Sequence, residues 1–186
     1  MRASRIEQLF LIAIASVSLC FPVVAADPIG QVIAITGQVT ATGDNNNPRP
    51  LALKSEVYLN DKIATAKGAK IQIMFDDDSV VSEGEASELV IDQYVYDPKE
   101  VKNGNCSLKL AKGVFRVITG KITDLNPDRF KVRTKMATIG IRGCELGFRL
   151  SKDKEDILVL HLPKGRTIVI DRTVDDLQGG LREQLD

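Results

Sequence analysis

Aromatic side chains are scarce in this sequence, which has no tryptophan and only 5% aromatic residues among its 186 positions. A hydrophobic core must therefore be built mainly from Val, Ile and Leu. Histidine is almost absent as well, because His161 is the single example. One histidine cannot form a His-rich metal site, and no Cys/His cluster with zinc-ligand spacing accompanies it. We therefore predict that the protein holds no metal ion and no other cofactor.

An excess of charge of either sign is also missing, since 25 Lys and Arg residues balance 25 Asp and Glu residues. Nucleic-acid binding favours a basic surface, so the sequence predicts no nucleic-acid partner. The chain has no Gly-x-Ser-x-Gly elbow and no Walker-type phosphate loop. His161 lies within an apolar stretch, where a strand residue is a better interpretation than a general base. We therefore predict that the protein is not an enzyme.

The N-terminus has the order of regions found in a secretory signal peptide. Arg2 and Arg5 precede an uncharged run, and the small residues of 23–26 close it. Pro22 leaves an apolar run shorter than the ~20 residues that a membrane helix needs. We predict a signal peptide over residues 1–26, cleavage near Ala25 or Ala26, and a periplasmic or secreted protein without a stable membrane span. An uncleaved membrane anchor is the alternative.

Two cysteines, Cys106 and Cys144, remain after removal of the signal peptide. An oxidising compartment favours a disulfide between them. A bridge of this loop length would contribute about 3–4 kcal/mol by restricting the unfolded chain. Two separate thiols, with Cys144 buried as a small apolar residue, are the alternative, and the sequence leaves both open.

The stretch 130–150 alternates apolar and other residues in three short blocks, which is typical of half-buried strands. The apolar rows are Phe130, Val132 and Thr134, then Ala137, Ile139 and Ile141, then Cys144, Leu146, Phe148 and Leu150. The apolar row shifts from even-numbered to odd-numbered residues at 135–136 and back to even-numbered residues at 142–143. We call each shift a parity change. Each change requires a bend or bulge, because the buried row would otherwise rotate into solvent. The pattern predicts a bent pair or triplet of strands.

Further short strands are expected along the chain. Residues 31–42 predict two strands around Gly37, and 51–75 alternates with turns at 60–61 and 67–68. Residues 157–162 and 167–170 flank a turn. Both their odd-numbered and their even-numbered positions are apolar, which is typical of strands covered on both faces. We predict a closing hairpin there. Strands so short and frequent, without a helical period, indicate an all-β sandwich or roll.

Several of these segments together resemble the FecR domain family. The similarity runs through F-x-V-x-T at 130–134, A-T-I-G-I-R-G at 137–143, D-x-I-x-T at 61–65, F-x-D-x-S at 75–79 and L-x-x-G at 110–113. It covers about residues 36–150. The matching motif positions are Asp61, Thr65, Asp77, Ser79, Gly113, Thr134, Gly140, Arg142, Gly143 and Phe148. This chain departs from the family pattern at Cys144, where threonine is usual, and at Asp78, where glycine is usual.

The resemblance implies a jelly-roll-like all-β fold. A β-solenoid-like stack is the alternative, because short arches at regular spacing would give much the same sequence pattern. The predicted organisation is a signal peptide over 1–26, a FecR-like domain over 27–172 and a polar C-terminal tail over 173–186. With no catalytic constellation, we expect a binding or scaffold module of the cell envelope, with a role in envelope signalling and an envelope protein or glycan as partner. The alternative is a membrane-anchored periplasmic regulator of an iron-uptake-type sigma-factor pathway. Against it, only residues 1–8 precede the apolar run, and the receptor-contacting region of such regulators is not recognisable after residue 172.

Two groups of charged residues deserve an interpretation. Asp76, Asp77 and Asp78, with Glu83 and Glu85 close behind, could form a weak calcium site, but their spacing lacks the EF-hand pattern. We predict a solvated hairpin turn there, with Asp78 in the left-handed position. Arg133, Lys135 and Arg142 could contact an acidic partner. The polar-out alternation of a half-buried sheet predicts instead that they lie on its solvent face.

Overall fold

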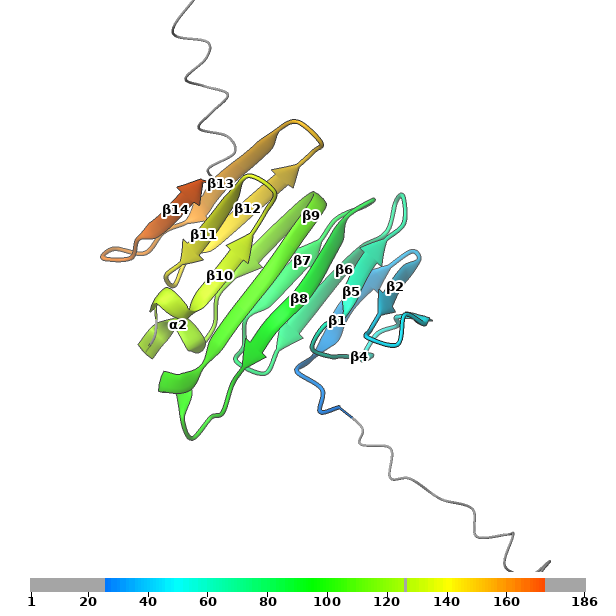
Figure 1. Ribbon diagram of the computed structural model, residues 1–186, viewed down its shortest axis with the longest axis horizontal. Helices are drawn as coiled ribbons and strands as arrows, with labels where there is room; N and C mark the ends of the chain where they lie inside the picture. The colour runs from blue at the N-terminus through cyan, green and yellow to red at the C-terminus, as the bar shows by residue number, and fades with distance from the viewer. Residues whose placement is uncertain (1–25, 126, 173–186) are drawn as a thin grey trace, which may run out of the picture.

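The computed structural model describes residues 26–125 and 127–172, which fold into a curled, almost entirely antiparallel sheet (Figure 1). One half, here called sheet A, has the strand order β4 (Glu56–Val57), β1 (Gly30–Thr36), β6 (Lys70–Phe75), β7 (Val80–Glu83), β9 (Asn105–Ile118), β12 (Glu145–Leu150) and β13 (Glu155–His161). The other half, sheet B, has the order β3 (Pro48–Pro50), β2 (Val39–Thr42), β5 (Lys62–Thr65), β8 (Glu88–Val95), β9, β10 (Phe130–Arg133), β11 (Ala137–Ile141) and β14 (Ile168–Arg172). The described helices are the short η1 (Val101–Asn103), α2 (Ile122–Leu125) and η2 (Pro127–Arg129).

One hydrophobic core lies between the two halves. Alternation along each strand buries one row of side chains, such as Ile71, Ile73 and Phe75 on β6. The Phe75 ring stacks on the ring of Tyr94 from β8, with 5.4 Å between centroids, so the core joins sheet A to sheet B. The all-β fold predicted from the sequence is confirmed. A β-solenoid stack would require parallel neighbours, whereas β9 and β10 are the single parallel pair among the described strands.

The central stretch forms three strands, the triplet among the two possibilities, a pair or a triplet, that its alternation predicts. Strands β10 and β11 form an antiparallel pair in sheet B, so the first parity change is the turn between them. The second change is the crossing from β11 in sheet B to β12 in sheet A. Gly143 lies in this crossing with φ +73°, a conformation that favours glycine. All three apolar rows are buried except at Thr134, which is half-buried.

Strand β9 belongs to both halves of the sheet. Its first part pairs with β8 and β10 in sheet B, and its last part pairs with β7 and β12 in sheet A. Gly113 lies where the pairing changes and has φ +109°. The strand therefore bends at this glycine and links the two layers of the core.

The predicted closing hairpin at 157–170 is wrong. Strand β13 pairs with β12 in sheet A, whereas β14 pairs with β11 in sheet B, so the two strands lie in opposite layers. Their apolar residues are also not covered on both faces, because several are 37–54% exposed. The prediction failed because consecutive apolar residues occur both in a hairpin covered on both faces and in two edge strands joined by a crossing.

The predicted signal peptide lies outside the described residues except for Ala26, and the predicted tail over 173–186 lies outside them entirely. Within the described part of the chain, no helix combines the length and the apolar character that crossing a bilayer requires.

Candidate functional site

Asp77 and Ser79, two of the motif positions, form a buried hydrogen-bond network with Tyr94. The Ser79 hydroxyl donates to Asp77 Oδ2 at 2.7 Å and accepts from the Gly120 amide at 2.8 Å. The Tyr94 hydroxyl accepts from the Asp77 amide at 2.9 Å and donates to Asp77 Oδ1 at 3.2 Å. Asp77 and Ser79 are both completely buried, and burial raises the pKa of Tyr94. The network therefore joins the β6–β7 turn to β8 and to the segment after β9.

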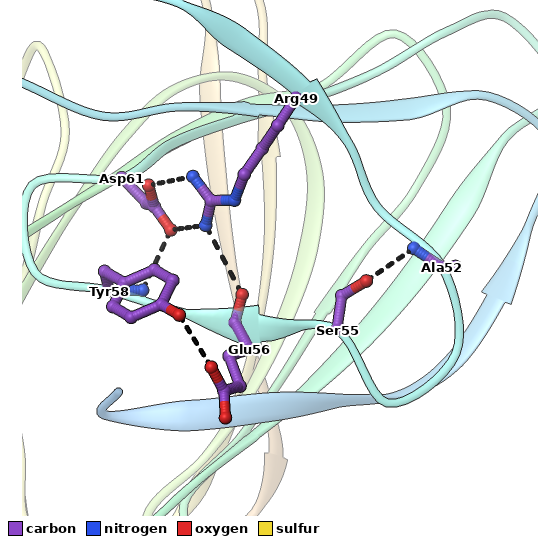
Figure 2. Close-up of polar contacts among 6 residues, drawn as sticks. All are labelled: Arg49, Ala52, Ser55, Glu56, Tyr58 and Asp61. Atoms are coloured by element: carbon purple, nitrogen blue, oxygen red, sulfur yellow. Dashed lines mark hydrogen bonds and ion pairs between the residues drawn. The ribbon is translucent and has the colours of Figure 1, made fainter. Parts of the chain in front are cut away.

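Asp61, another motif position, is the centre of a second polar cluster (Figure 2). Its carboxylate is 1% exposed and accepts from Arg49 Nη1 at 2.8 Å, from Arg49 Nη2 at 2.5 Å and from the Tyr58 amide at 2.8 Å. This geometry is a bidentate Arg–carboxylate pair, which is stronger and more directional than a single ion pair. Hydrogen bonding to Asp61 raises the pKa of Arg49, so the guanidinium stays charged.

The Tyr58 ring completes this cluster. The Arg49 guanidinium carbon lies 5.1 Å from the ring centroid, within cation–π range. The Tyr58 hydroxyl donates to Glu56 Oε2 at 2.6 Å, and this hydrogen bond raises the pKa of Tyr58. The ring and the ion pair are therefore held in one orientation by β3, by β4 and by the turn before β5.

A cleft of about 560 Å³, with both polar and apolar side chains in its lining, opens beside this cluster, at the end of the fold formed by β2, β3 and β4. The lining includes Asp44, Asn45 and Asn47 from the β2–β3 loop, together with Arg49, Tyr58 and Asp61. Amide side chains donate and accept hydrogen bonds, and carboxylates accept them. The cleft thus offers groups that match a polar, hydroxyl-rich ligand, next to a half-buried aromatic ring. Arg49 and Tyr58 are absent from the sequence-based site, because only Asp61 belongs to the motif.

Thr65 and Gly113 hold the two sheet halves together where the chain crosses between them. The Thr65 hydroxyl donates to the Gly84 carbonyl at 2.6 Å and accepts from the Ser87 amide at 3.0 Å. The Ser87 hydroxyl in turn accepts from the Val114 amide at 3.0 Å. A Cβ atom at Gly113 would lie 1.9 Å from the Ser87 hydroxyl oxygen, so this position admits only glycine.

Thr134 and Arg142 lie at the two parity changes of the central stretch. The Thr134 hydroxyl accepts from the Ala137 amide at 3.0 Å and donates to Glu155 Oε2 at 2.5 Å, which joins the β10–β11 turn to β13. Arg142 forms an ion pair with Asp128. These contacts hold turns and crossings in place.

The remaining motif positions, Gly140, Gly143 and Phe148, serve packing and chain direction. Phe148 is 1% exposed in the core. A Cβ atom at Gly143 would lie 2.9 Å from the Arg166 guanidinium, whereas one at Gly140 would make an ordinary 3.8 Å contact with Val169.

The carboxylates of the β6–β7 turn do not converge on one point. Asp76 and Asp78 are exposed, whereas Asp77 is buried, so the prediction of a solvated hairpin turn is wrong for Asp77. Asp78 has φ +65°, the left-handed conformation that the sequence predicts. Within residues 26–125 and 127–172, no group of three His, Cys, Asp or Glu side chains could hold a metal ion.

Glu83 is a buried carboxyl whose position the sequence does not reveal. It is 1% exposed, and neither of its carboxyl oxygens has a hydrogen-bond partner. Burial, reinforced by the charge of Glu88, raises its pKa to about 8. The side chain is therefore mainly protonated at neutral pH, because a neutral carboxyl is cheaper to bury than a carboxylate.

Cys106 and Cys144 are buried free thiols in the structure, so the disulfide between them is not formed. Cys106 lies at the start of β9, opposite Tyr94 on β8 and Phe130 on β10. Burial raises the pKa of both thiols, which makes them poor nucleophiles.

His161 and the basic residues of the central stretch lie on the surface and do not form one site. His161 is exposed at the end of β13. Arg133 is ion-paired with Asp92, and the Lys135 ammonium donates to the Lys152 carbonyl at 3.4 Å. The charges are thus distributed over local contacts on the outside of the fold.

Taken together, the described residues form an all-β module in which most of the motif residues hold turns, crossings and the core. A sequence model described as "FecR protein" matches residues 61–162, more than half of the chain. The chain belongs to the FecR family. Strands β1 to β4 precede the matched range and are nevertheless part of the same curled sheet.

Two further comparisons add little. Comparison with curated proteins gives no match. A solved structure described as "Cell surface anchoring domain" is 25% identical, and the similarity covers 34% of this chain and 83% of that chain at a TM-score of 0.33.

Proposed function

We propose that this protein is a non-catalytic binding or scaffold module of the cell envelope, exported to the periplasm or secreted. Membership of the FecR family, whose domains are regulatory and not known for catalysis, supports this proposal. The order of basic, apolar and small residues in 1–26 supports export.

The cleft beside Arg49 and Asp61 is the observation that carries the binding role. Its volume of about 560 Å³ lies within the range of ligand pockets. Asp44, Asn45 and Asn47 supply donors and acceptors, and the Tyr58 ring supplies an apolar surface next to them. We infer a glycan as ligand, because sugar hydroxyls donate and accept hydrogen bonds and sugar rings carry apolar C–H groups. An envelope protein is the other candidate partner.

Co-sedimentation with insoluble envelope glycan tests the binding role. The mature chain is expected to co-sediment with the glycan, and Asn47→Ala is expected to weaken retention at least tenfold. Asn103→Ala is the matched control, because Asn103 is an exposed amide on η1, outside the residues that line the cleft. Equal retention of both variants would exclude the cleft as the glycan site. Turnover of an ester, glycan or peptide panel that a cleft mutation abolishes would overturn the non-catalytic role.

A membrane-anchored periplasmic regulator of a sigma-factor pathway is the second candidate, and FecR family membership is the observation that favours it. N-terminal sequencing of the exported protein distinguishes the two. A mature start near Ala26 or Asp27 supports the exported module, whereas an intact Met1 in the membrane fraction supports the anchored regulator.

A further inference from the structure

The end of the fold formed by β13 and β14 exposes an unusual amount of apolar surface. Strand β13 pairs only with β12, and β14 pairs only with β11, so among the described strands each has one free edge. Large apolar side chains on these strands and the adjoining crossing are 37–54% exposed, namely Leu158, Val159, Leu160, Leu162, Val169 and Ile170. We call this surface the β13/β14 end. An exposed, apolar edge strand is a ready template for pairing with another strand.

Part of this exposed surface belongs to the core itself. Val159 lies opposite the buried Leu146, and Ile170 lies opposite the buried Ile139, so both side chains are in inward-facing rows. They are nevertheless 54% and 49% exposed. A cavity of about 310 Å³, lined by both apolar and charged side chains that include Ile157 and Ile170, opens between the two edge strands. The core is therefore left open at this end.

The opposite end of the fold is protected against strand addition. Its edge strands are β3, three residues long with a proline at each end, and β4, only two residues long. Very short edge strands and edge prolines prevent pairing with other chains. Strand β13, by contrast, has seven residues, β14 has five, and neither contains a proline. The two ends of the fold thus differ in their capacity to accept a partner.

We propose that a second copy of this chain covers the β13/β14 end and forms a symmetric dimer. A two-fold axis perpendicular to the sheets passes through both layers. The same rotation therefore sets β13 antiparallel to its symmetry copy in sheet A and β14 antiparallel to its copy in sheet B. Both free edges gain hydrogen-bond partners, and the inward rows of Val159 and Ile170 continue into the second core.

Side-chain chemistry fits this arrangement. With the axis at Val159, Leu158 lies opposite Leu160 of the second copy, and the reverse pair forms by symmetry. The central residues 157–160 carry no charge, so no like charges meet there. The protected β3/β4 end also stops further addition, which makes the assembly a closed dimer and not a filament.

The composition of the segment 173–186 makes it a poorer candidate than a second copy for covering the β13/β14 end. It contains Gly179 and Gly180 and four carboxylate side chains, all of which are disfavoured in strands. A second copy supplies two strands with the required spacing between layers.

Sedimentation equilibrium of the mature chain tests the dimer. The wild-type chain is expected to dimerise reversibly, and Val159→Lys is expected to raise the dimer dissociation constant at least 100-fold, because symmetry brings the new charges together. Val95→Lys is the matched control, since Val95 is also a strand residue, is 55% exposed and lies on β8, away from this end. Leu160→Lys gives a second disrupting variant, and circular dichroism checks that each variant is folded. Hydrogen exchange should show amides of β13 and β14 that become protected as concentration rises.

A wild-type chain that stays monomeric as concentration rises would overturn the proposal. So would a dimer that Val159→Lys and Leu160→Lys leave as stable as Val95→Lys does. Deletion of residues 173–186 that converts a monomer into an oligomer would show that the C-terminal segment, and not a second copy, covers this end.

Discussion

The carboxyl of Glu83 illustrates how a single residue can make the stability of this fold depend on pH. The side chain is buried without a hydrogen-bond partner, and its pKa of about 8 lies far above the usual 4.5. Between these two pH values the folded chain holds a proton that the unfolded chain releases. The stabilising effect of this proton is fully present below about pH 4.5 and is lost as the pH rises through about 8.

Glu83→Gln should therefore flatten the pH dependence of folding. In the wild type, the free energy of unfolding is expected to fall by about 1.4 kcal/mol per pH unit between about pH 5.5 and 7.5 from this group alone. The neutral amide of the variant has no proton to lose. Urea unfolding of both proteins at several pH values gives the difference between their slopes. Parallel curves would contradict the buried position of the carboxyl.

The Asp77 network gives a second prediction at the residue scale. Removing the carboxylate in Asp77→Ala leaves the buried hydroxyls of Ser79 and Tyr94 without their shared partner. We expect a loss of about 2–4 kcal/mol in the free energy of unfolding. Asp76→Ala is the control, because Asp76 is the exposed neighbour in the same turn, and a change within about 0.5 kcal/mol is expected. Both values come from urea unfolding. Equal losses in the two variants would contradict the network.

At the scale of an element, the bend of β9 connects the two halves of the sheet. The bend depends on the positive φ of Gly113 and on the close approach of Ser87, which occupies the position that a Cβ atom at Gly113 would take. Any side chain at this position must displace the neighbouring backbone or straighten the strand. The crossing of one strand between two layers therefore depends on a single residue.

Gly113→Ala is expected to lower the free energy of unfolding by at least about 2 kcal/mol, from backbone strain and the clash with Ser87. Gly140→Ala is the matched control in another strand, because a Cβ atom there meets Val169 at an ordinary 3.8 Å. Gly140→Ala should leave the free energy of unfolding unchanged or raise it by up to about 1 kcal/mol, since glycine weakens a strand interior. Thermal or urea unfolding measures both. A Gly113→Ala protein as stable as Gly140→Ala would show that the bend does not require glycine.

At the scale of the whole molecule, the described fold has one core that both sheet halves share. Its two thiols lie within this core and are not bridged. Interactions between the halves, such as the stacked rings of Phe75 and Tyr94, couple the unfolding of one to the unfolding of the other. A single cooperative transition is expected for such a unit.

Reductant should leave this transition unchanged. A bridge between Cys106 and Cys144 would contribute about 3–4 kcal/mol, and reduction would remove it. Free buried thiols contribute no such stabilisation, so the urea midpoints of unfolding with and without reductant should coincide. Thiol titration should find both cysteines reactive in the unfolded protein and unreactive in the folded one. A midpoint that falls on reduction would show that the bridge forms.

Local patterns in the sequence predicted much of the fold. The alternation in 130–150 predicts a bent pair or triplet of strands with two parity changes, because the two faces of a strand see core and solvent in turn. The structure has three strands there. Asp78 was expected in the left-handed turn position, and it has this conformation. The cleft beside Arg49 and Asp61 is not predicted by the sequence, because Arg49 and Tyr58 reach Asp61 through pairings of β2, β3 and β5 that no local pattern reveals.

The sequence by itself determined the all-β class, the positions of many turns and the FecR family, since strand period, turn chemistry and motif spacing are local properties. Tertiary structure alone decided which half of the sheet each strand joins, as the separation of β13 from β14 shows. It also decided that Asp77 and Glu83 are buried while Val159 and Ile170 are exposed. The physical reason is that burial depends on what packs across the core, and strands distant in sequence supply that packing.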